Sequence, residues 1–414
     1  MHFSEHAVTL IILITLTGSY FLDKIADFLN LTNLDQPLPE EFQEHYDAAR
    51  YKASQDYLKA NTKFEFITST TDLFILIAFW FSGGFRMVDD FVRSLSLSPI
   101  VSGLVFTGIL LGMKFIISIP FNIYSTFVIE EKFGFNKTNA GIFIADLIKS
   151  LTLSIILGSI LLSVILWVLQ SFETSAWLIC WVVCAVFLLA VQYIVPTWIM
   201  PLFNKFTPLE PGPLKDAIIS YARSIDFSLS NIFVMDGSKR STKSNAFFTG
   251  FGRNKRIVLF DTLINNHNQD ELVAILAHEM GHFKKRHIIK RLTAGILQMG
   301  FMFYLLSIFI SSPVLFHAFF LDNISIYAGL VFFGLLYSPI DLFVSILFQI
   351  SSRKDEYEAD RFAAITTGNS TALVNALKKL SVANLSNLTP HPFYVFLNYS
   401  HPPVLERIRA LSAL

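Results

Sequence analysis

The stretch "ELVAILAHEMGHFKKRH" (residues 271–287) contains two histidines four positions apart, His278 and His282, with Glu279 directly after the first. Its apolar residues recur with a helical period. On a helix, positions i and i+4 lie one turn apart on the same face, so both histidines can bind one metal ion. Glu279 can then reach a metal-bound water without binding the metal itself, and we predict that it is the catalytic base.

Two histidines leave such a site one protein ligand short, because catalytic zinc is usually held by three. The C-terminal stretch "SSRKDEYEADRFAAITTG" (residues 351–368) also has a helical period. It places Glu356 and Asp360 on one face, and we predict that Glu356 is the third ligand and that Asp360 accepts a ring N–H from a ligand histidine. Glu358 is a rival ligand on the opposite side of that helix. His287 is predicted to turn away from the histidine pair.

The composition indicates that lipid is the solvent for much of the chain. Of its 414 residues, 53% are hydrophobic and only 15% are charged, and the mean hydropathy is +0.53. A soluble domain has a larger charged fraction to cover its surface. Acidic and basic residues balance at 32 each, which gives no support for a nucleic-acid partner.

A membrane span needs about 20 mostly apolar residues. Seven stretches qualify, at about 7–22, 66–84, 100–121, 147–170, 175–196, 292–312 and 326–350. Asp72 and Asp341 interrupt the second and the seventh stretch. An ionisable group at membrane depth usually faces a protein interior or a water-filled cavity, so these carboxylates indicate a bundle that encloses water.

The distribution of Lys and Arg predicts how the bundle is oriented. The segment 197–291 and the tail after the seventh span are rich in basic residues, whereas the loop 312–325 between the last two spans has none. Basic loops stay in the cytoplasm. The histidine pair and the C-terminal carboxylates are therefore expected on the same, cytoplasmic side.

Three strand-like runs precede the histidine-bearing helix, at 231–236, 244–250 and 255–263. Turn residues separate them, and we predict a small antiparallel meander. Asn268, with Glu271 three residues later, is typical of a capping box at the start of the next helix.

The chain resembles the type I CAAX prenyl proteases, a family of seven-span membrane zinc metalloproteases, nearly from end to end. The matching motifs are "EEKFGFNKT" (130–138), "MPLFNKFTPL" (200–209), "SNAFFTGFGRNKRIVLFDTL" (244–263), "LAHEMGHFKKRH" (276–287), "SSRKDEYEADRFA" (351–363) and "YSHPPVLERIRAL" (399–411). The resemblance implies that His278, His282 and Glu356 bind one Zn²⁺ per chain and that Glu279 is the base.

The resemblance also implies a fold: an α-helical integral membrane protein whose seven transmembrane helices enclose a chamber, with a cytoplasmic, gluzincin-like metalloprotease region that carries the meander. We expect one membrane-embedded unit in four parts. These are transmembrane helices 1–5 with their loops (1–196), the meander and metal helix (197–291), transmembrane helices 6–7 (292–350) and the C-terminal helices with the third ligand (351–414).

Four further residues match family motifs. Asn245 and Ala246 lie in the strand that, in this family, runs along the substrate, and an exposed strand edge can hold an extended peptide by backbone hydrogen bonds. An ordinary edge strand with a turn-forming Asn is the alternative. His401 is a candidate to stabilise the oxyanion, or else a helix cap. Arg409 is a candidate for substrate binding, or else part of a structural salt bridge.

The function implied is removal of the C-terminal tripeptide from prenylated CAAX proteins or peptides, with a second cleavage nearer the N-terminus also within the family's range. The expected partners are a prenylated or membrane-associated peptide and the lipid bilayer. Two alternatives stay open: a zinc protease for membrane-protein quality control, and a metal-binding transporter. Ligands just outside the spans favour hydrolysis, because transport sites lie near mid-membrane on discontinuous helices.

The end of the sequence, "LSAL", follows the last motif closely and contains no retrieval signal. On that ground a bacterial inner membrane is the favoured location, with the endoplasmic reticulum membrane expected for a eukaryotic source. In either case the catalytic side is expected to face the cytoplasm.

Overall fold

Seven helices are long and apolar enough to cross a membrane in the computed structural model, which describes residues 4–34, 36–229, 231–249 and 256–414. The predicted number of spans is confirmed. The first four spans are α1 (Glu5–Thr32), α2 (Ala48–Phe81), α4 (Pro99–Tyr124) continued by the π-helix η2 (Ser125–Glu130), and α5 (Ala140–Ser171). The fifth span is one continuous run of η3 (Glu173–Ser175), α6 (Ala176–Ile194), η4 (Val195–Ile199) and α7 (Met200–Phe203). The last two spans are α11 (His287–Phe309) and α13 (Ile326–Thr367).

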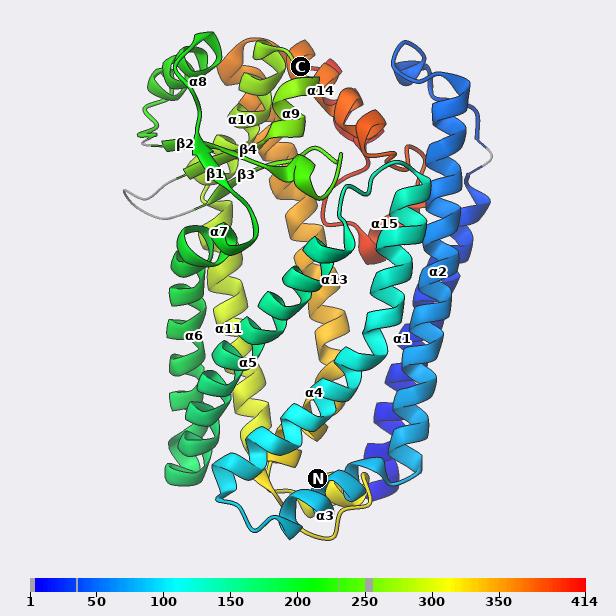
Figure 1. Cartoon of the computed structure of the whole chain (residues 1–414), viewed down its shortest axis with the longest axis vertical. Helices are drawn as coiled ribbons and strands as arrows, with labels where there is room; N and C mark the ends of the chain where they lie inside the picture. The colour runs from blue at the N-terminus through cyan, green and yellow to red at the C-terminus, as the bar shows by residue number, and fades with distance from the viewer. Residues whose placement is uncertain (1–3, 35, 230, 250–255) are drawn as a thin grey trace.

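The shorter helices gather at the two ends of the bundle. In Figure 1, α8, α9, α10 and α14 lie at the end that holds the C-terminus, and α3 lies at the end that holds the N-terminus. The shorter helices are η1 (Glu40–Phe42), α3 (Gly84–Ser94), α8 (Pro213–Ser224), η5 (Gly237–Lys239), α9 (Asp261–Asn266), α10 (Gln269–Lys284), α12 (Pro313–His317), α14 (Ser370–Ala383), α15 (Pro392–Asn398) and α16 (Val404–Ser412).

Helix α13 continues well beyond its apolar stretch. It ends at Thr367, and the next residue, Gly368, adopts a left-handed backbone conformation with φ of 64° that suits a glycine at a helix C-terminus. The boundary expected at residue 350 therefore falls inside one helix. Because the helix does not break there, it carries Glu356 and Asp360 rigidly from the spanning region to the catalytic end.

Among the described residues the sheet has four strands, β1 (Phe206–Pro208), β2 (Asn231–Met235), β3 (Ala246–Thr249) and β4 (Arg256–Phe260), in the order β1-β2-β4-β3. β2 and β4 are parallel, whereas the pairs β1–β2 and β3–β4 are antiparallel. The predicted three-stranded antiparallel meander is therefore wrong: the sheet is mixed and contains a fourth strand.

The physical reason lies in the connection after β2, which forms no hairpin. It runs through η5 and is held away from the sheet by backbone hydrogen bonds from Lys137 to Arg240 and from Thr242 to Phe135. β4 can then enter beside β2, and β3 becomes the edge strand. The expected turn between β3 and β4 lies outside the described residues.

Helix α10 is placed by its own cap and by a close crossing with α13. The capping box between Asn268 and Glu271 is present, as predicted. At Gly281, an added Cβ would lie 3.3 Å from backbone atoms of Ala359 on α13, tighter than most Cβ contacts. A glycine at this point thus lets the two helix backbones approach, which brings the ligand-bearing faces of α10 and α13 together.

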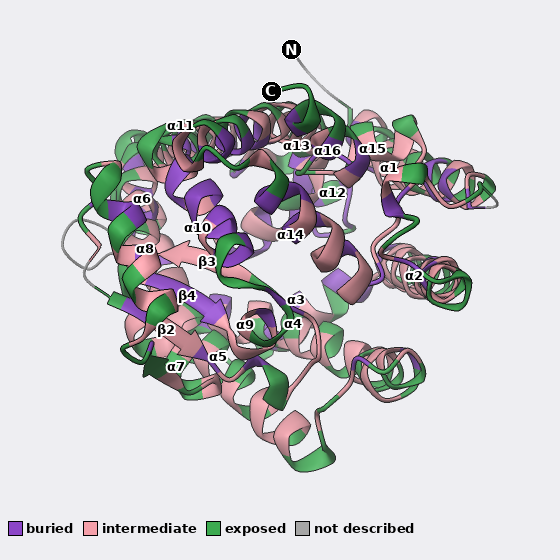
Figure 2. Ribbon diagram, turned by 90° about the horizontal axis from the view of Figure 1, so that it is seen from above, coloured by how far each residue is buried: buried purple, intermediate pink, exposed green. Residues whose placement is uncertain are grey.

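Seen from above, the spanning helices stand in a ring, an arrangement consistent with the predicted chamber (Figure 2). Within the spans, Asp72 forms an ion pair with Lys114 at 2.5 Å, and Asp341 accepts a hydrogen bond from Gln298 at 3.3 Å. Both intramembrane carboxylates therefore have a polar partner on a neighbouring helix.

Candidate metal centre

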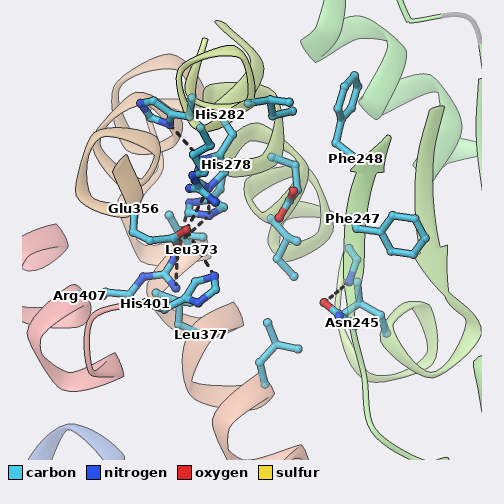
Figure 3. A pocket seen from close by; sticks show the side chains of 18 residues that line it. Asn245, Phe247, Phe248, His278, His282, Glu356, Leu373, Leu377, His401 and Arg407 are labelled. Atoms are coloured by element: carbon cyan, nitrogen blue, oxygen red, sulfur yellow. Dashed lines mark hydrogen bonds and ion pairs between the residues drawn. The ribbon is translucent and has the colours of Figure 1, made fainter. Parts of the chain in front are cut away.

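Two helices bring three candidate ligands to one point. His278 and His282 come from α10 and Glu356 comes from α13, and their ligand atoms all lie within 4.8 Å of one another. The two histidine Nε2 atoms are 3.1 Å apart. The Glu356 carboxylate bridges them, with Oε1 3.2 Å from His282 and Oε2 3.4 Å from His278 (Figure 3).

These three residues fit a bound metal ion. Glu356 is only 2% exposed, and its buried Oε2, although 3.4 Å from His278 Nε2 and 3.6 Å from Arg407 Nη1, makes no hydrogen bond to any described residue, a costly state for a carboxylate oxygen. Two imidazoles and one carboxylate are a donor set used by catalytic zinc, which keeps a further position for water. A bound divalent cation would explain both the Glu356 oxygen that makes no hydrogen bond and the two histidine nitrogens that lie beside it.

Asp360 and Arg407 support His278 from behind. The Asp360 Oδ1 atom lies 2.8 Å from His278 Nδ1, the ring atom on the far side from the ligand cluster. The Arg407 guanidinium donates two hydrogen bonds, of 2.7 and 2.8 Å, to the same carboxylate. This fork neutralises the buried charge of Asp360 and fixes where that carboxylate points.

Glu279 lines the same cavity as the three candidate ligands. Burial raises the pKa of the Glu279 carboxyl, although the neighbouring His278 and His282 lower it. A carboxylate with a raised pKa is a stronger base, so its environment suits proton abstraction near neutral pH.

His287 corrects one expectation from the sequence. Instead of turning away, it is buried at the start of α11, and its Nδ1 lies 3.0 Å from Nδ1 of His282. Glu358 is directed outward, as expected, with its side chain 62% exposed, and it contacts His287 at 3.3 Å. The sequence interpretation assumed one continuous helix, but Arg286 has a left-handed φ of 60° and separates α10 from α11.

His401 and Arg409 have different positions. His401 lines the cavity, with Nε2 3.4 Å from Glu356 Oε1. Arg409 lies outside the cavity and forms an ion pair with Glu41 at 2.8 Å, its side chain 66% exposed. The ion pair fits the structural alternative for Arg409: on α16, Arg407 faces the site, and two residues further along the helix turns Arg409 away.

The edge strand β3 forms the wall opposite the candidate ligands (Figure 3). Asn245 and Ala246 both line the cavity, and the Asn245 side chain accepts a hydrogen bond from the Ala246 backbone N–H at 2.8 Å. Among the described residues β3 pairs with β4 on one side only, so its other edge can take an added peptide strand.

Helix α14 adds an apolar wall to the same cavity through Leu373, Leu377 and Leu380. These residues follow a helical spacing of four and three, so they lie along one face of α14. The cavity thus combines a cluster of metal-binding groups, a buried carboxylate, a strand edge and an aliphatic surface.

A multi-span helix bundle with this site defines a membrane-embedded metalloprotease. Residues 27–205 match the family described as CAAX prenyl protease N-terminal, five membrane helices. Residues 208–414 match Peptidase family M48. The chain belongs to Peptidase family M48, in its CAAX prenyl protease branch.

Similar proteins share almost the whole chain. CAAX prenyl protease 1 of Saccharomyces cerevisiae is 36% identical, over 91% of this chain and 88% of its own. The CAAX prenyl protease 1 homologs of Arabidopsis thaliana and Homo sapiens are 36% and 31% identical, over 95% and 91% of this chain and 95% and 89% of their own. The crystal structure of S. mikatae Ste24p superimposes with a TM-score of 0.93 at 34% identity, covering 98% of this chain and 99% of that one.

Proposed function

We propose that this chain is a zinc-dependent endopeptidase that removes the C-terminal tripeptide from prenylated CAAX proteins or peptides. His278, His282 and Glu356 hold one Zn²⁺ per chain, and Glu279 is the base. The observation that carries the proposal is the convergence of three buried ligand atoms, with one Glu356 oxygen lacking a hydrogen bond, on a cavity bordered by an open strand edge.

When bound, Zn²⁺ supplies Lewis acidity that polarises a carbonyl and lowers the pKa of a water molecule. Glu279 takes a proton from the attacking water and passes it to the nitrogen of the leaving tripeptide. His401 donates a hydrogen bond to the carbonyl oxygen as negative charge develops there. Asp360 holds the His278 proton on Nδ1, which leaves Nε2 free to bind metal.

The substrate is proposed to bind as an extended strand along β3, next to Asn245 and Ala246. The Leu373, Leu377 and Leu380 surface offers apolar contact to the aliphatic side chains of a CAAX tripeptide. A prenyl chain would hold such a substrate at the bilayer in which the enzyme itself lies.

The chain is an integral, multi-pass membrane protein, and we propose that its catalytic side faces the cytoplasm. The basic segments on that side of the bundle support this orientation. The relatives named above come from a fungus, a plant and an animal, which favours the endoplasmic reticulum over a bacterial inner membrane.

The test compares two peptides of one sequence, prenylated and unprenylated, incubated with the purified chain in lipid vesicles. We expect the prenylated peptide to lose its last three residues and the unprenylated one to react far more slowly. Equal cleavage of both would instead indicate a quality-control protease. No cleavage of either peptide by the zinc-loaded protein would overturn the proposal and favour a metal-binding transporter.

A further inference from the structure

The two candidate ligand histidines are supported differently on their far sides. His278 faces the anionic Asp360 across 2.8 Å, whereas the Nδ1 atom of His282 faces Nδ1 of another histidine, His287, across 3.0 Å. His287 is only 2% exposed. Nothing in the sequence motif assigns a task to this buried imidazole.

The possible proton positions restrict what this pair of rings can do. The Nε2 atom of His282 faces the ligand cluster, 3.2 Å from Glu356, and must present a lone pair to bind a metal. Its proton then resides on Nδ1 and points at His287. Two N–H groups cannot form a hydrogen bond with each other, so Nδ1 of His287 must be the acceptor, and its own proton must reside on Nε2.

The other side of His287 matches that assignment. Its Nε2 lies 3.3 Å from Glu358 Oε2 and 3.7 Å from Asp355 Oδ1, so carboxylates are placed to accept the proton there. Asp355 is buried and also contacts Lys290 at 2.9 Å and Arg291 at 3.4 Å, which offset its charge. Because these carboxylates can accept a hydrogen bond from Nε2, they favour the tautomer in which His287 carries its proton on Nε2. Its Nδ1 can then accept a hydrogen bond from His282.

We propose that His287 is a positioning residue for the metal site: as a neutral acceptor, it holds the His282 proton on Nδ1 and aims Nε2 at the metal. The chain of contacts runs from His282 through His287 to the carboxylates of Glu358 and Asp355. The left-handed turn at Arg286 makes this possible, because it brings the first residue of α11 back beside α10.

This inference rests on the proposed metal site and adds a residue to it. Groups that orient a ligand histidine through its other ring nitrogen typically contribute about 10–100-fold to metal affinity. The effect should therefore appear in zinc binding itself, before any effect on cleavage.

The experiment measures zinc affinity of the full chain by competition with a chromophoric chelator, for the parent and two variants. His287→Leu removes the acceptor, whereas His287→Asn keeps a carbonyl oxygen close to the place of Nδ1. We expect the Leu variant to lose about 10–100-fold in affinity and the Asn variant to retain most of it. Thermal unfolding of the metal-free proteins checks that the variants are folded.

A matched control removes a different buried histidine near the other end of α10. His267, 8% exposed, contacts the Leu263 carbonyl oxygen through Nδ1 at 3.0 Å. His267→Leu should leave zinc affinity unchanged. Parental affinity in His287→Leu, or equal losses in the Leu and Asn variants, would overturn the positioning role.

A second pair keeps the inference testable if His287→Leu does not fold. Glu358 is exposed, so Glu358→Gln and Glu358→Lys should both fold. The Gln side chain keeps an acceptor for the Nε2–H group of His287, whereas the Lys side chain places a cation beside it. Glu358→Lys should therefore weaken zinc binding several-fold more than Glu358→Gln. Equal zinc affinities of these two variants would contradict the inference. A parent that binds no zinc would instead overturn the proposed function.

Discussion

The catalytic end and the membrane-spanning part of this protein are built on different principles. In the spanning helices, only 6–17% of the most apolar windows is buried inside the protein. In α10, by contrast, Leu276, Ala277 and Met280 are completely buried. Lipid must cover most of the apolar surface of the spans, whereas the catalytic end has a core of the kind found in water-soluble domains.

Charged groups differ in the same way. At the catalytic end, Asp360 and Arg407 are both largely buried and hold each other in a two-bond fork. In the spans, Asp72 and Lys114 form an ion pair whose side chains are 44% and 57% exposed. The comparison teaches that removing one partner of a buried pair at the catalytic end should cost far more stability than removing one partner of a half-exposed pair in the spans.

The largest effect is expected from Glu279→Gln. The substitution keeps the size of the side chain but removes the base, so cleavage of a prenylated peptide should fall by about 10²–10⁴-fold. Zinc content and thermal stability should match the parent, because Glu279 is not a proposed ligand. Cleavage at the parental rate would exclude Glu279 as the base.

Next in size is Arg407→Leu, compared with Arg409→Leu on the same helix. Removing Arg407 leaves the Asp360 charge buried without its partner, which should destabilise the catalytic end by about 3–5 kcal/mol. Arg409 forms an exposed pair, so its loss should cost about 0–1 kcal/mol. Denaturant unfolding of the two variants measures the difference, and equal destabilisation would show that the distinction between these arginines is wrong.

A smaller effect should follow from Gly281→Val, compared with Gly300→Val. At Gly281 the new side chain would push α10 away from α13 and so separate the histidines from Glu356, lowering zinc affinity about tenfold. At Gly300 it would press on Trp181, 2.9 Å from the added Cβ, within the spans. Gly300→Val should therefore lower thermal stability while zinc affinity stays at the parental value. A loss of zinc affinity in Gly300→Val would contradict the separation between the catalytic end and the spans.

The smallest effect is expected from Lys114→Met. Asp72 and Lys114 line one cavity between the spanning helices, and in the water-filled chamber that the fold implies, the loss of this half-exposed pair should change stability by no more than about 1 kcal/mol and leave zinc affinity unchanged. Thermal unfolding in lipid vesicles, together with zinc titration, measures both. A large loss of zinc binding would mean that the spans control the site directly.

Some of this architecture could be predicted from sequence because it depends on local or compositional properties. The seven spans follow from apolar length, and the cap of α10 from two residues three positions apart. The helical period placed Asp360 one turn from Glu356, and in the structure its carboxylate lies 2.8 Å from His278.

Other features depended on contacts that no local pattern contains. Strand order was missed because the insertion of β4 beside β2 is set by the long connection through η5. Arg407 was missed in favour of Arg409 because packing of α16 decides which of two nearby arginines faces inward. His287 was misplaced because a single left-handed residue, Arg286, interrupts an otherwise helical pattern.

The most direct test of the central claim is the zinc content of Glu356→Gln, measured beside the parent and Glu279→Gln after dialysis against a weak chelator. If His278, His282 and Glu356 form the metal site, the parent and Glu279→Gln should each retain one zinc ion per chain, and Glu356→Gln should lose most of it. Full retention of zinc by folded Glu356→Gln would contradict the assignment of the third ligand.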